Sequence, residues 1–179
     1  ERVIGVMMPN GEQKDINDSK KVCELLGIKN LTVNIGNTYK ILTGDICVGI
    51  MNDVSGGNLK NEIPSLYSTN TPARLRMTTL YGVAAIFGGF VCNSCNFSED
   101  FVGYSTKYGD AAGDFSLLNR LTKTEVVELG DYMNLPKELV HKTPSDGMCG
   151  KSDEDNMGFT YEELDTFILD GIAPKSLEV

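Results

Sequence analysis

The first part of the chain alternates short apolar runs with longer segments whose apolar side chains recur at helical spacing. Residues 2–8 (RVIGVMM) are a short apolar run, which predicts a strand buried on both faces. Residues 31–35 (LTVNI) alternate apolar and polar side chains, which predicts a second strand. Residues 15–26 and 38–54 have helical spacing, and residues 55–70 are rich in Gly, Ser, Asn and Pro. We therefore expect two helices and a loop in these three segments.

A third helix is predicted to begin sharply at Thr71 and Pro72. The Thr71 side chain can cap the free N–H groups of a first turn, and proline is tolerated at the first helical position. The helix is expected to run to about Phe87, where two glycines stop it. Residues 90–92 then predict a third strand.

The pattern after the central polar segment is mainly helical. Helices and turns are expected at residues 122–133, 136–140 and 160–169, and a long polar loop at residues 142–158. Thr160 and Glu163 have the spacing of a capping box, which predicts the start of the last helix.

Strand, helix, strand, helix and strand at this spacing predict an α/β fold with a doubly wound, Rossmann-like parallel sheet. The chain has 179 residues, a length that suits one domain with a substantial core. No internal repeat or low-complexity tract divides it. We therefore expect a single domain over residues 1–179.

The composition narrows the classes of partner. Acidic residues outnumber basic ones by 25 to 16, which gives a formal net charge of −9 and disfavours a nucleic-acid partner. An acidic protein still binds an anionic nucleotide where local Lys, Arg, Mg²⁺ and helix N-termini make the electrostatic potential of the site positive. The longest nearly apolar run, residues 81–92, is too short to span a bilayer, so no membrane partner is expected. Five scattered cysteines are an odd count, which suits a reducing cytoplasm.

Cysteine and histidine chemistry has little support. Cys92 and Cys95 form a CxxC pair, which is typical of a redox couple or of half a zinc site. The sequence has no second CxxC and a single histidine, so a structural role for the pair is favoured. That histidine, His141, stands beside Lys142 at the start of a polar stretch and is expected on the surface rather than as a catalytic base.

Residues 93–114 (NSCNFSEDFVGYSTKYGDAAGD) concentrate reactive side chains among glycines. Gly103, Gly109 and Gly113 permit positive φ and the close approach of a ligand to the main chain. Carboxylates suit Mg²⁺, and a lysine ammonium suits phosphate as a point charge. The segment follows a predicted buried strand, which is where open α/β sheets place their ligands. We interpret it as a site rather than as a solvated polar loop.

Three motifs in this order carry a resemblance to a known family: NTPARLRM at 70–77, SEDFVGYSTKYGDAAGDF at 98–115 and KTPSDGMCGKSDEDNMGFTYEELD at 142–165. Over residues 5–171 the chain resembles ammonia-dependent NAD synthetase, a member of the ATP pyrophosphatase superfamily. The resemblance implies a cytoplasmic, homodimeric ligase. ATP adenylates the nicotinate carboxylate of deamido-NAD and releases pyrophosphate; ammonia then attacks the acyl-adenylate to give NAD and AMP.

The resemblance also implies roles for seven residues by their positions in the motifs. Deamido-NAD contacts are expected from Arg74, Lys107 and Asp114, ATP contacts from Ser94, Lys123 and Ser145, and a Mg²⁺ ligand from Glu99. Lys107 and Glu99 are expected to serve catalysis. Ser94 departs from the threonine of better-known members. Lys123 is expected near a helix start whose dipole already favours phosphate.

Two family features are missing from the sequence. The phosphate-binding SGG-acid-Ser loop, which also supplies an aspartate for magnesium, is expected upstream of Glu1, and a C-terminal His-Lys pair does not occur. Residues 55–57 (SGG) are not this loop, because Asn and Leu follow them instead of an acid and a serine. We therefore expect a core fragment of an NAD synthetase domain. Its residues 142–158 have the Gly, Ser and Asp content of a segment that orders over bound substrate.

Three alternatives remain open from the sequence. A related ATP pyrophosphatase-type synthetase, such as a GMP-synthetase-like or glutamine-dependent NAD synthetase domain, would share the sheet and differ in the substrate loop. A non-catalytic nucleotide-binding module would agree with the missing phosphate loop. A redox or zinc module would use Cys92 and Cys95.

Overall fold

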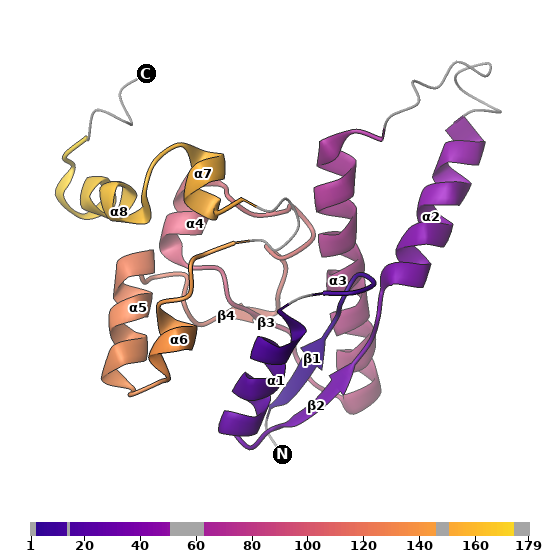
Figure 1. Cartoon of the computed structure of the whole chain (residues 1–179), viewed down its shortest axis with the longest axis horizontal. Coiled ribbons are helices and arrows are strands. Elements are labelled where there is room, and N and C mark those ends of the chain that lie inside the picture. Colours follow the sequence, from indigo (N-terminus) through magenta and orange to yellow (C-terminus); the bar gives the residue numbers. More distant parts are fainter. Residues whose placement is uncertain (1–2, 14, 51–62, 146–150, 174–179) are drawn as a thin grey trace. The chain divides into compact units, whose positions relative to one another are not determined.

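In the computed structural model, described residues 3–13, 15–50, 63–145 and 151–173 form an α/β fold in which every assigned strand pair is parallel. This confirms the fold class expected from the sequence. The chain divides into two compact units, residues 1–89 and 90–179 (Figure 1). The single domain expected over residues 1–179 stays a prediction.

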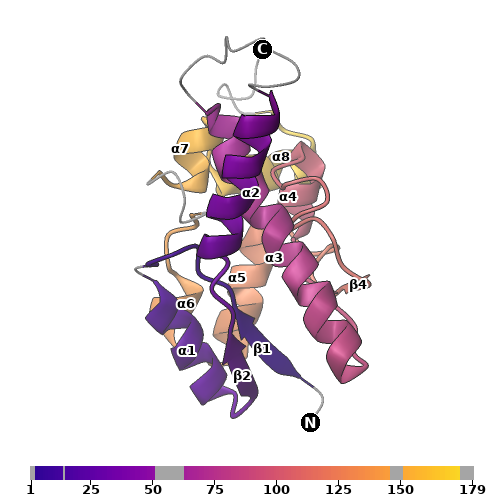
Figure 2. The same cartoon turned by 90° about the vertical axis from the view of Figure 1, so that its right-hand side faces the viewer.

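Where the structure describes it, the first unit is a two-stranded parallel sheet with three helices. Its elements are β1 (Ile4–Met7), α1 (Ile16–Leu25), β2 (Lys29–Thr32), α2 (Gly36–Gly49) and α3 (Ser65–Phe87). β1 pairs with β2 from Ile4 opposite Lys29 to Met7 opposite Thr32. α1 packs so closely on β1 that a Cβ at Gly5 would lie 2.6 Å from the Cys23 sulfur. α2 and α3 lie side by side (Figures 1 and 2).

The second unit surrounds a shorter parallel pair with five helices in its described part. Its elements are β3 (Cys92–Asn93), α4 (Phe97–Val102), β4 (Phe115–Ser116), α5 (Lys123–Tyr132), α6 (Lys137–Val140), α7 (Asp153–Met157) and α8 (Tyr161–Asp170). β3 pairs with β4 through Cys92 opposite Phe115. The core includes Val91, Cys95 and Leu164, all less than 9% exposed. α8 packs against both α4 and α5.

Capping boxes begin four helices of the second unit. Each pairs an N-terminal Asn, Thr or Ser with an acid three residues later: Asn96 with Glu99, Thr122 with Glu125, Ser152 with Asp155, and Thr160 with Glu163. Each box satisfies two backbone N–H groups that a helix start would otherwise leave unpaired. The predicted box at Thr160 is confirmed, and the same local pattern accounts for two helices, α4 and α7, that the sequence interpretation missed.

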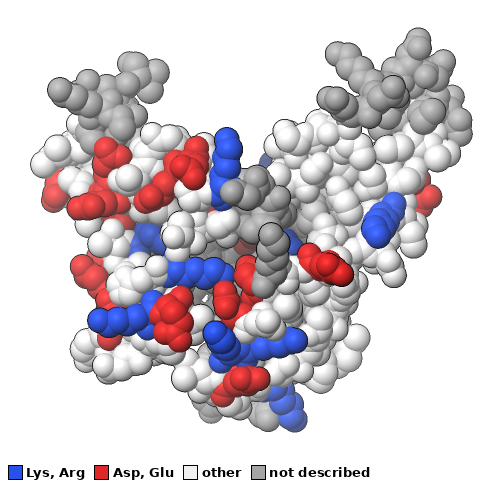
Figure 3. Space-filling view, viewed as in Figure 1, with Lys and Arg blue, Asp and Glu red and all other residues white. Residues whose placement is uncertain are grey.

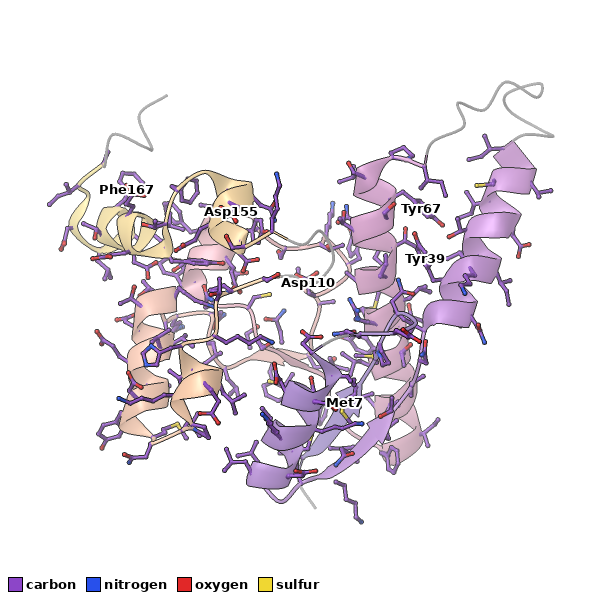
Figure 4. All side chains as sticks on the ribbon, in the orientation of Figure 1. Met7, Tyr39, Tyr67, Asp110, Asp155 and Phe167 are labelled. Carbon is purple, nitrogen blue, oxygen red and sulfur yellow. The ribbon has the colours of Figure 1, made fainter. Side chains whose placement is uncertain are left out.

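The predicted start of the third helix was wrong. α3 begins at Ser65 after Pro64, and Pro72 lies inside it. The extra turns are held by packing against α2: the Tyr67 ring centroid lies 6.2 Å from that of Tyr39, and the Tyr67 hydroxyl lies 3.0 Å from the Thr43 hydroxyl (Figure 4). This tertiary contact outweighs the local signal for a helix start at proline.

Two further predictions differ from the structure in their bounds. β2 lies at Lys29–Thr32, earlier than the predicted 31–35, yet the N–H groups of Val33 and Ile35 still bond to the carbonyls of Met7 and Pro9. The predicted loop at 142–158 contains α7, whose end is the left-handed Gly158. Residues 51–54 of the second predicted helix lie outside the described part of the chain, as do residues 55–57 and residues 146–150 of the 142–158 segment. No helix in the described ranges is long and apolar enough to cross a membrane.

Candidate active site

Two of the seven predicted site residues form a direct pair. Glu99 is the third residue of α4 and Lys123 is the first residue of α5. The Lys123 ammonium nitrogen lies 4.0 Å from Glu99 Oε1, and the two side chains are only 24% and 19% exposed. The same ammonium lies 5.2 Å from the centroid of the Tyr161 ring. A half-buried cation is thus shared between a carboxylate and an aromatic face.

The two oxygens of Glu99 have different partners. Oε2 accepts a hydrogen bond from the N–H of Asn96 at 3.1 Å and so completes the capping box of α4. Oε1 faces Lys123. Burial raises the pKa of Glu99 above its ordinary value of 4.5, although the Asn96 hydrogen bonds and the Lys123 charge act in the opposite direction. One oxygen is therefore structural, and the other faces a cation.

The start of α5 does not offer its amides to a phosphate. The N–H of Lys123 donates to the Ser98 hydroxyl at 2.9 Å, and the N–H of Thr124 donates to Asp165 Oδ2 at 2.7 Å. The third N–H is held by the capping box of the helix itself. The expectation that the dipole of this helix supports phosphate binding therefore needs correction, because Asp165 already supplies the negative charge there. Lys123 has to reach a nucleotide through its side chain.

A tyrosine and carboxylate group beside this pair was missed by sequence reasoning. Asp153 is 8% exposed, and its two carboxylate oxygens lie 3.4 Å from the hydroxyls of Tyr104 and Tyr161. Burial, followed by the charges of Glu99 and Asp153, raises the pKa of Tyr161. Tyr161 therefore stays protonated and gives Lys123 a neutral aromatic face. Asp153 stands in a segment predicted to be a loop, and no local pattern singles it out.

Lys107 stands in a tight turn between α4 and β4. The carboxylate of Asp110 accepts from the N–H of Thr106 at 3.1 Å, and the carbonyl of Asp110 accepts from Asn93 Nδ2 at 2.9 Å (Figure 4). Tyr108 has φ of 61°, which is uncommon for a residue other than glycine and costs conformational free energy. The exposed Lys107 ammonium lies 5.0 Å from the Tyr108 ring centroid.

The glycines of this segment serve different purposes. Gly103 has φ of 70° and ends α4. Gly113 permits close backbone approach, since a Cβ there would lie 2.7 Å from the Asn93 nitrogen. The next residue, Asp114, accepts from the N–H of Val91 at 2.7 Å, and its own N–H donates to the Val91 carbonyl at 2.8 Å. One oxygen of this predicted substrate-binding carboxylate therefore fastens the loop beside β3.

The other three predicted site residues stand on separate segments. Arg74 is exposed on α3 of the first unit. Ser94 is exposed directly after β3, and Ser145 donates from its hydroxyl to the carbonyl of Lys151 at 3.1 Å. All three residues are exposed polar groups, and the ligands expected for them stay predictions.

The cysteine alternative is not favoured by the geometry. Cys92 and Cys95 are both free thiols that contact different carbonyls, those of Asn93 and Asp110. Burial, followed by the charge of Glu99, raises the pKa of Cys95 to about 11, so this thiol stays protonated at neutral pH and is a poor nucleophile. Within the described ranges, no three His, Cys, Asp or Glu side chains cluster as metal ligands. His141 is on the surface as predicted, 3.0 Å from Asp131.

The chain is similar to known proteins over nearly its whole length. The NH(3)-dependent NAD(+) synthetase of Carboxydothermus hydrogenoformans is 36% identical over 177 residues, which cover 96% of this chain and 68% of that protein. The protein of the same name from Methanococcoides burtonii is 35% identical over 181 residues, which cover 99% of this chain and 65% of that protein. This chain thus spans about two thirds of the length of these two relatives.

A solved structure agrees with these similarities. The NMN synthetase of Francisella tularensis superposes with a TM-score of 0.85 and 32% identity, covering 98% of this chain and 70% of that one. The family model for NAD synthase matches residues 1–176. The chain therefore belongs to the NAD synthase family.

Proposed function

We propose that the protein is an ammonia-dependent NAD synthetase, a ligase that joins ammonia to the nicotinate carboxyl of deamido-NAD. ATP transfers AMP to that carboxylate and releases pyrophosphate; ammonia then displaces AMP and forms the amide of NAD. The observation that carries the proposal is the half-buried Glu99–Lys123 pair in a chain of this family. The pair supports the proposal because ATP-dependent adenylation needs a cation near the phosphates and a carboxylate for a metal ion, and Lys123 and Glu99 would supply them.

Glu99 fits the Mg²⁺ that the family implies. Its Oε2 is engaged by the capping box, and its Oε1 is a hard oxygen donor of the type that Mg²⁺ prefers. Bound Mg²⁺ would supply positive charge against the phosphates. Lys123 would exchange its contact with Glu99 for one with the phosphates. The charge of Glu99 would then be neutralised by Mg²⁺, and that of Lys123 by the phosphates. Ser94 and Ser145 would provide hydroxyl contacts to ATP.

Local cations are needed because part of the second unit is acidic. Acidic side chains gather over α7 and α8 (Figure 3), where the first turns include Glu154, Asp155, Glu162 and Glu163. Such a surface repels polyphosphate unless nearby cations compensate. Lys107 and Arg74 would hold deamido-NAD through its anionic groups, and Asp114 would accept from its hydroxyl or amide donors. Lys107 would also stand at the reacting carboxylate.

A second candidate substrate is nicotinate mononucleotide. The similarity to the Francisella tularensis NMN synthetase, at 32% identity and a TM-score of 0.85, supports it. Amidation of the mononucleotide uses the same chemistry at the same carboxyl group and differs in the absence of the adenylate half. We favour deamido-NAD as the substrate because the two curated relatives, at 35% and 36% identity, are named as NAD(+) synthetases.

We also propose a cytoplasmic homodimer. α2 and α3 leave large apolar side chains exposed, among them Ile41 and Val48 on α2 and Leu66 and Ile86 on α3. An interface would cover such side chains, since a contiguous exposed apolar patch is typical of a protein interaction site. The cysteines of the described part of the chain are free thiols, which suits a reducing compartment.

The test is turnover by the full-length protein with ATP, Mg²⁺, ammonium and either deamido-NAD or nicotinate mononucleotide. We expect NAD, AMP and pyrophosphate in equal amounts, and a loss of about 100-fold or more in kcat/KM for Lys107→Ala. Lys137→Ala, a change of an exposed lysine on α6, is the matched control and should keep full activity.

Other outcomes identify the alternatives. Faster turnover of the mononucleotide would make the protein an NMN synthetase. AMP release that does not depend on either nucleotide acid would indicate another adenylating synthetase. ATP binding without any turnover would support a non-catalytic nucleotide-binding module.

A further inference from the structure

A buried carboxylate on α8 joins three helices of the second unit. Asp165 is 3% exposed, and its Oδ1 accepts from the Ser98 hydroxyl of α4, whose side chain is fully buried. Its Oδ2 accepts twice from Thr124 of α5, from the backbone N–H at 2.7 Å and from the hydroxyl at 2.6 Å. Each oxygen of one carboxylate thus holds a different helix.

The residues that Asp165 holds are the sequence neighbours of the candidate site pair. Ser98 directly precedes Glu99, and Thr124 directly follows Lys123. The Ser98 hydroxyl also accepts from the N–H of Lys123 at 2.9 Å. The backbones that carry Glu99 and Lys123 are therefore connected through two buried side chains, independently of the 4.0 Å contact between the two charged groups.

Helix capping explains only part of this arrangement. The capping box at the start of α5 satisfies two N–H groups there. Ser98 and Asp165 accept from the two between them, those of Lys123 and Thr124. Asp165 also accepts from the Ser98 hydroxyl of α4, which the capping of α5 does not require. Burying a carboxylate is costly unless it is fully hydrogen-bonded. What its second oxygen adds is a fixed geometry between the first turns of α4 and α5.

We propose that Asp165 is a positioning residue for Mg²⁺-ATP binding, acting through Ser98 and Thr124 on the Glu99–Lys123 pair. This inference rests on the proposed function, because that function assigns Glu99 and Lys123 to the nucleotide. Groups that are held before the ligand arrives bind it without a further ordering cost. Substitution of a residue that orients a metal ligand typically lowers metal affinity or activity by about 10- to 100-fold.

The test is calorimetric titration of the full-length protein with Mg²⁺-ATP and, separately, with deamido-NAD. Asp165→Asn keeps the size of the side chain and replaces one acceptor oxygen with a donor. We expect it to weaken Mg²⁺-ATP binding by ~10-fold or more and deamido-NAD binding by less than ~2-fold. Glu162→Gln, the same chemical change at an exposed residue of α8, is the matched control and should leave both affinities unchanged.

A double-mutant cycle with Lys123→Ala separates positioning from general destabilisation. If Asp165 acts through Lys123, Asp165→Asn should weaken Mg²⁺-ATP binding by less than ~2-fold in the Lys123→Ala background. An undiminished effect in that background would overturn the proposal. Equal weakening of both ligands would also overturn it, since it would indicate a merely structural residue.

A milder variant covers the case in which Asp165→Asn does not fold. Thr124→Val removes one of the hydrogen bonds to Oδ2 and should weaken Mg²⁺-ATP binding in the same direction, whereas Thr124→Ser keeps the hydroxyl and should restore it. Equal binding by Thr124→Val and Thr124→Ser would contradict the proposal. The readout is binding, so a wild-type protein that binds Mg²⁺-ATP but makes no NAD would refute the proposed function and leave this inference standing.

Discussion

Glu99 combines two tasks at one side chain. As the third residue of α4 it receives the Asn96 N–H on Oε2, and as the expected magnesium ligand it offers Oε1. With one oxygen engaged by the helix start, Glu99 should bind a cation through a single oxygen. The sequence predicted the ligand role through the resemblance, whereas the capping role depends on α4, a helix that was not predicted within residues 93–114.

Two substitutions of Glu99 should separate these tasks. Glutamine also completes a capping box, so Glu99→Gln should fold well and lose Mg²⁺-dependent turnover by about 100-fold or more. Glu99→Ala should lose the same activity and lower the free energy of unfolding by about 1 kcal/mol more than Glu99→Gln. Denaturant unfolding and steady-state kinetics measure the two effects. Equal stability of both variants would show that the box contributes nothing.

Glu99 should also make the stability of the wild type depend on pH. The pKa of Glu99 is raised above 4.5 in the folded chain, so the folded state binds the proton more tightly than the unfolded state. This contribution to stability is present below 4.5 and is lost as pH rises through the folded-state pKa. Glu99→Gln removes the titration. The wild type should therefore lose stability relative to Glu99→Gln between acid and neutral pH.

At the scale of elements, local signals predicted that a helix exists better than they predicted the residue at which it begins. The apolar period of residues 122–133 predicted α5 to within one residue at each end. The predicted start of α3 was wrong because Tyr67 packs against α2, a contact between residues that are distant in the sequence. α7 was missed because its five residues carry little apolar pattern.

The close approach of Gly113 to Asn93 of β3 makes Gly113 a sensitive position. Gly113→Ala would put its Cβ 2.7 Å from the Asn93 backbone nitrogen, so backbone has to move. We expect a loss of about 1–3 kcal/mol in the free energy of unfolding, measured by denaturant titration.

Gly89→Ala is the matched control, because its Cβ would meet nothing within 4 Å and its φ is not positive. Its effect should stay below about 0.5 kcal/mol. Equal losses for the two variants would mean that the close approach at Asn93 has no energetic weight.

At the scale of the whole molecule, the sequence predicted the α/β class, the parallel strands and the family. The site was predicted less completely. Glu99 and Lys123 were each assigned through motifs, but their direct contact, and the groups at Asp153 and Asp165, join residues that are far apart in the sequence. No local pattern encodes such contacts, because they depend on how α4, α5 and α8 pack.

The proposed homodimer belongs to this scale as well. A lysine in place of the exposed Ile41 on α2 should weaken a dimer that uses this surface, because it would bury an unpaired charge there. We expect sedimentation to show a dimer for the wild type and a larger monomer fraction for Ile41→Lys. Tyr132→Lys, at an exposed site on α5, should leave the dimer intact. A wild type that sediments as a monomer would contradict the proposal.

The three-helix junction at Asp165 also sets an order of events during protein synthesis. Ser98 and Asp165 are 67 residues apart, so at about 5–20 residues per second the ribosome adds Asp165 roughly 3–13 s after Ser98. Until α8 emerges, the first turn of α5 has no carboxylate to receive the Thr124 N–H. A nascent chain should therefore assemble the first unit early and fix the geometry between the first turns of α4 and α5 only after α8 has emerged.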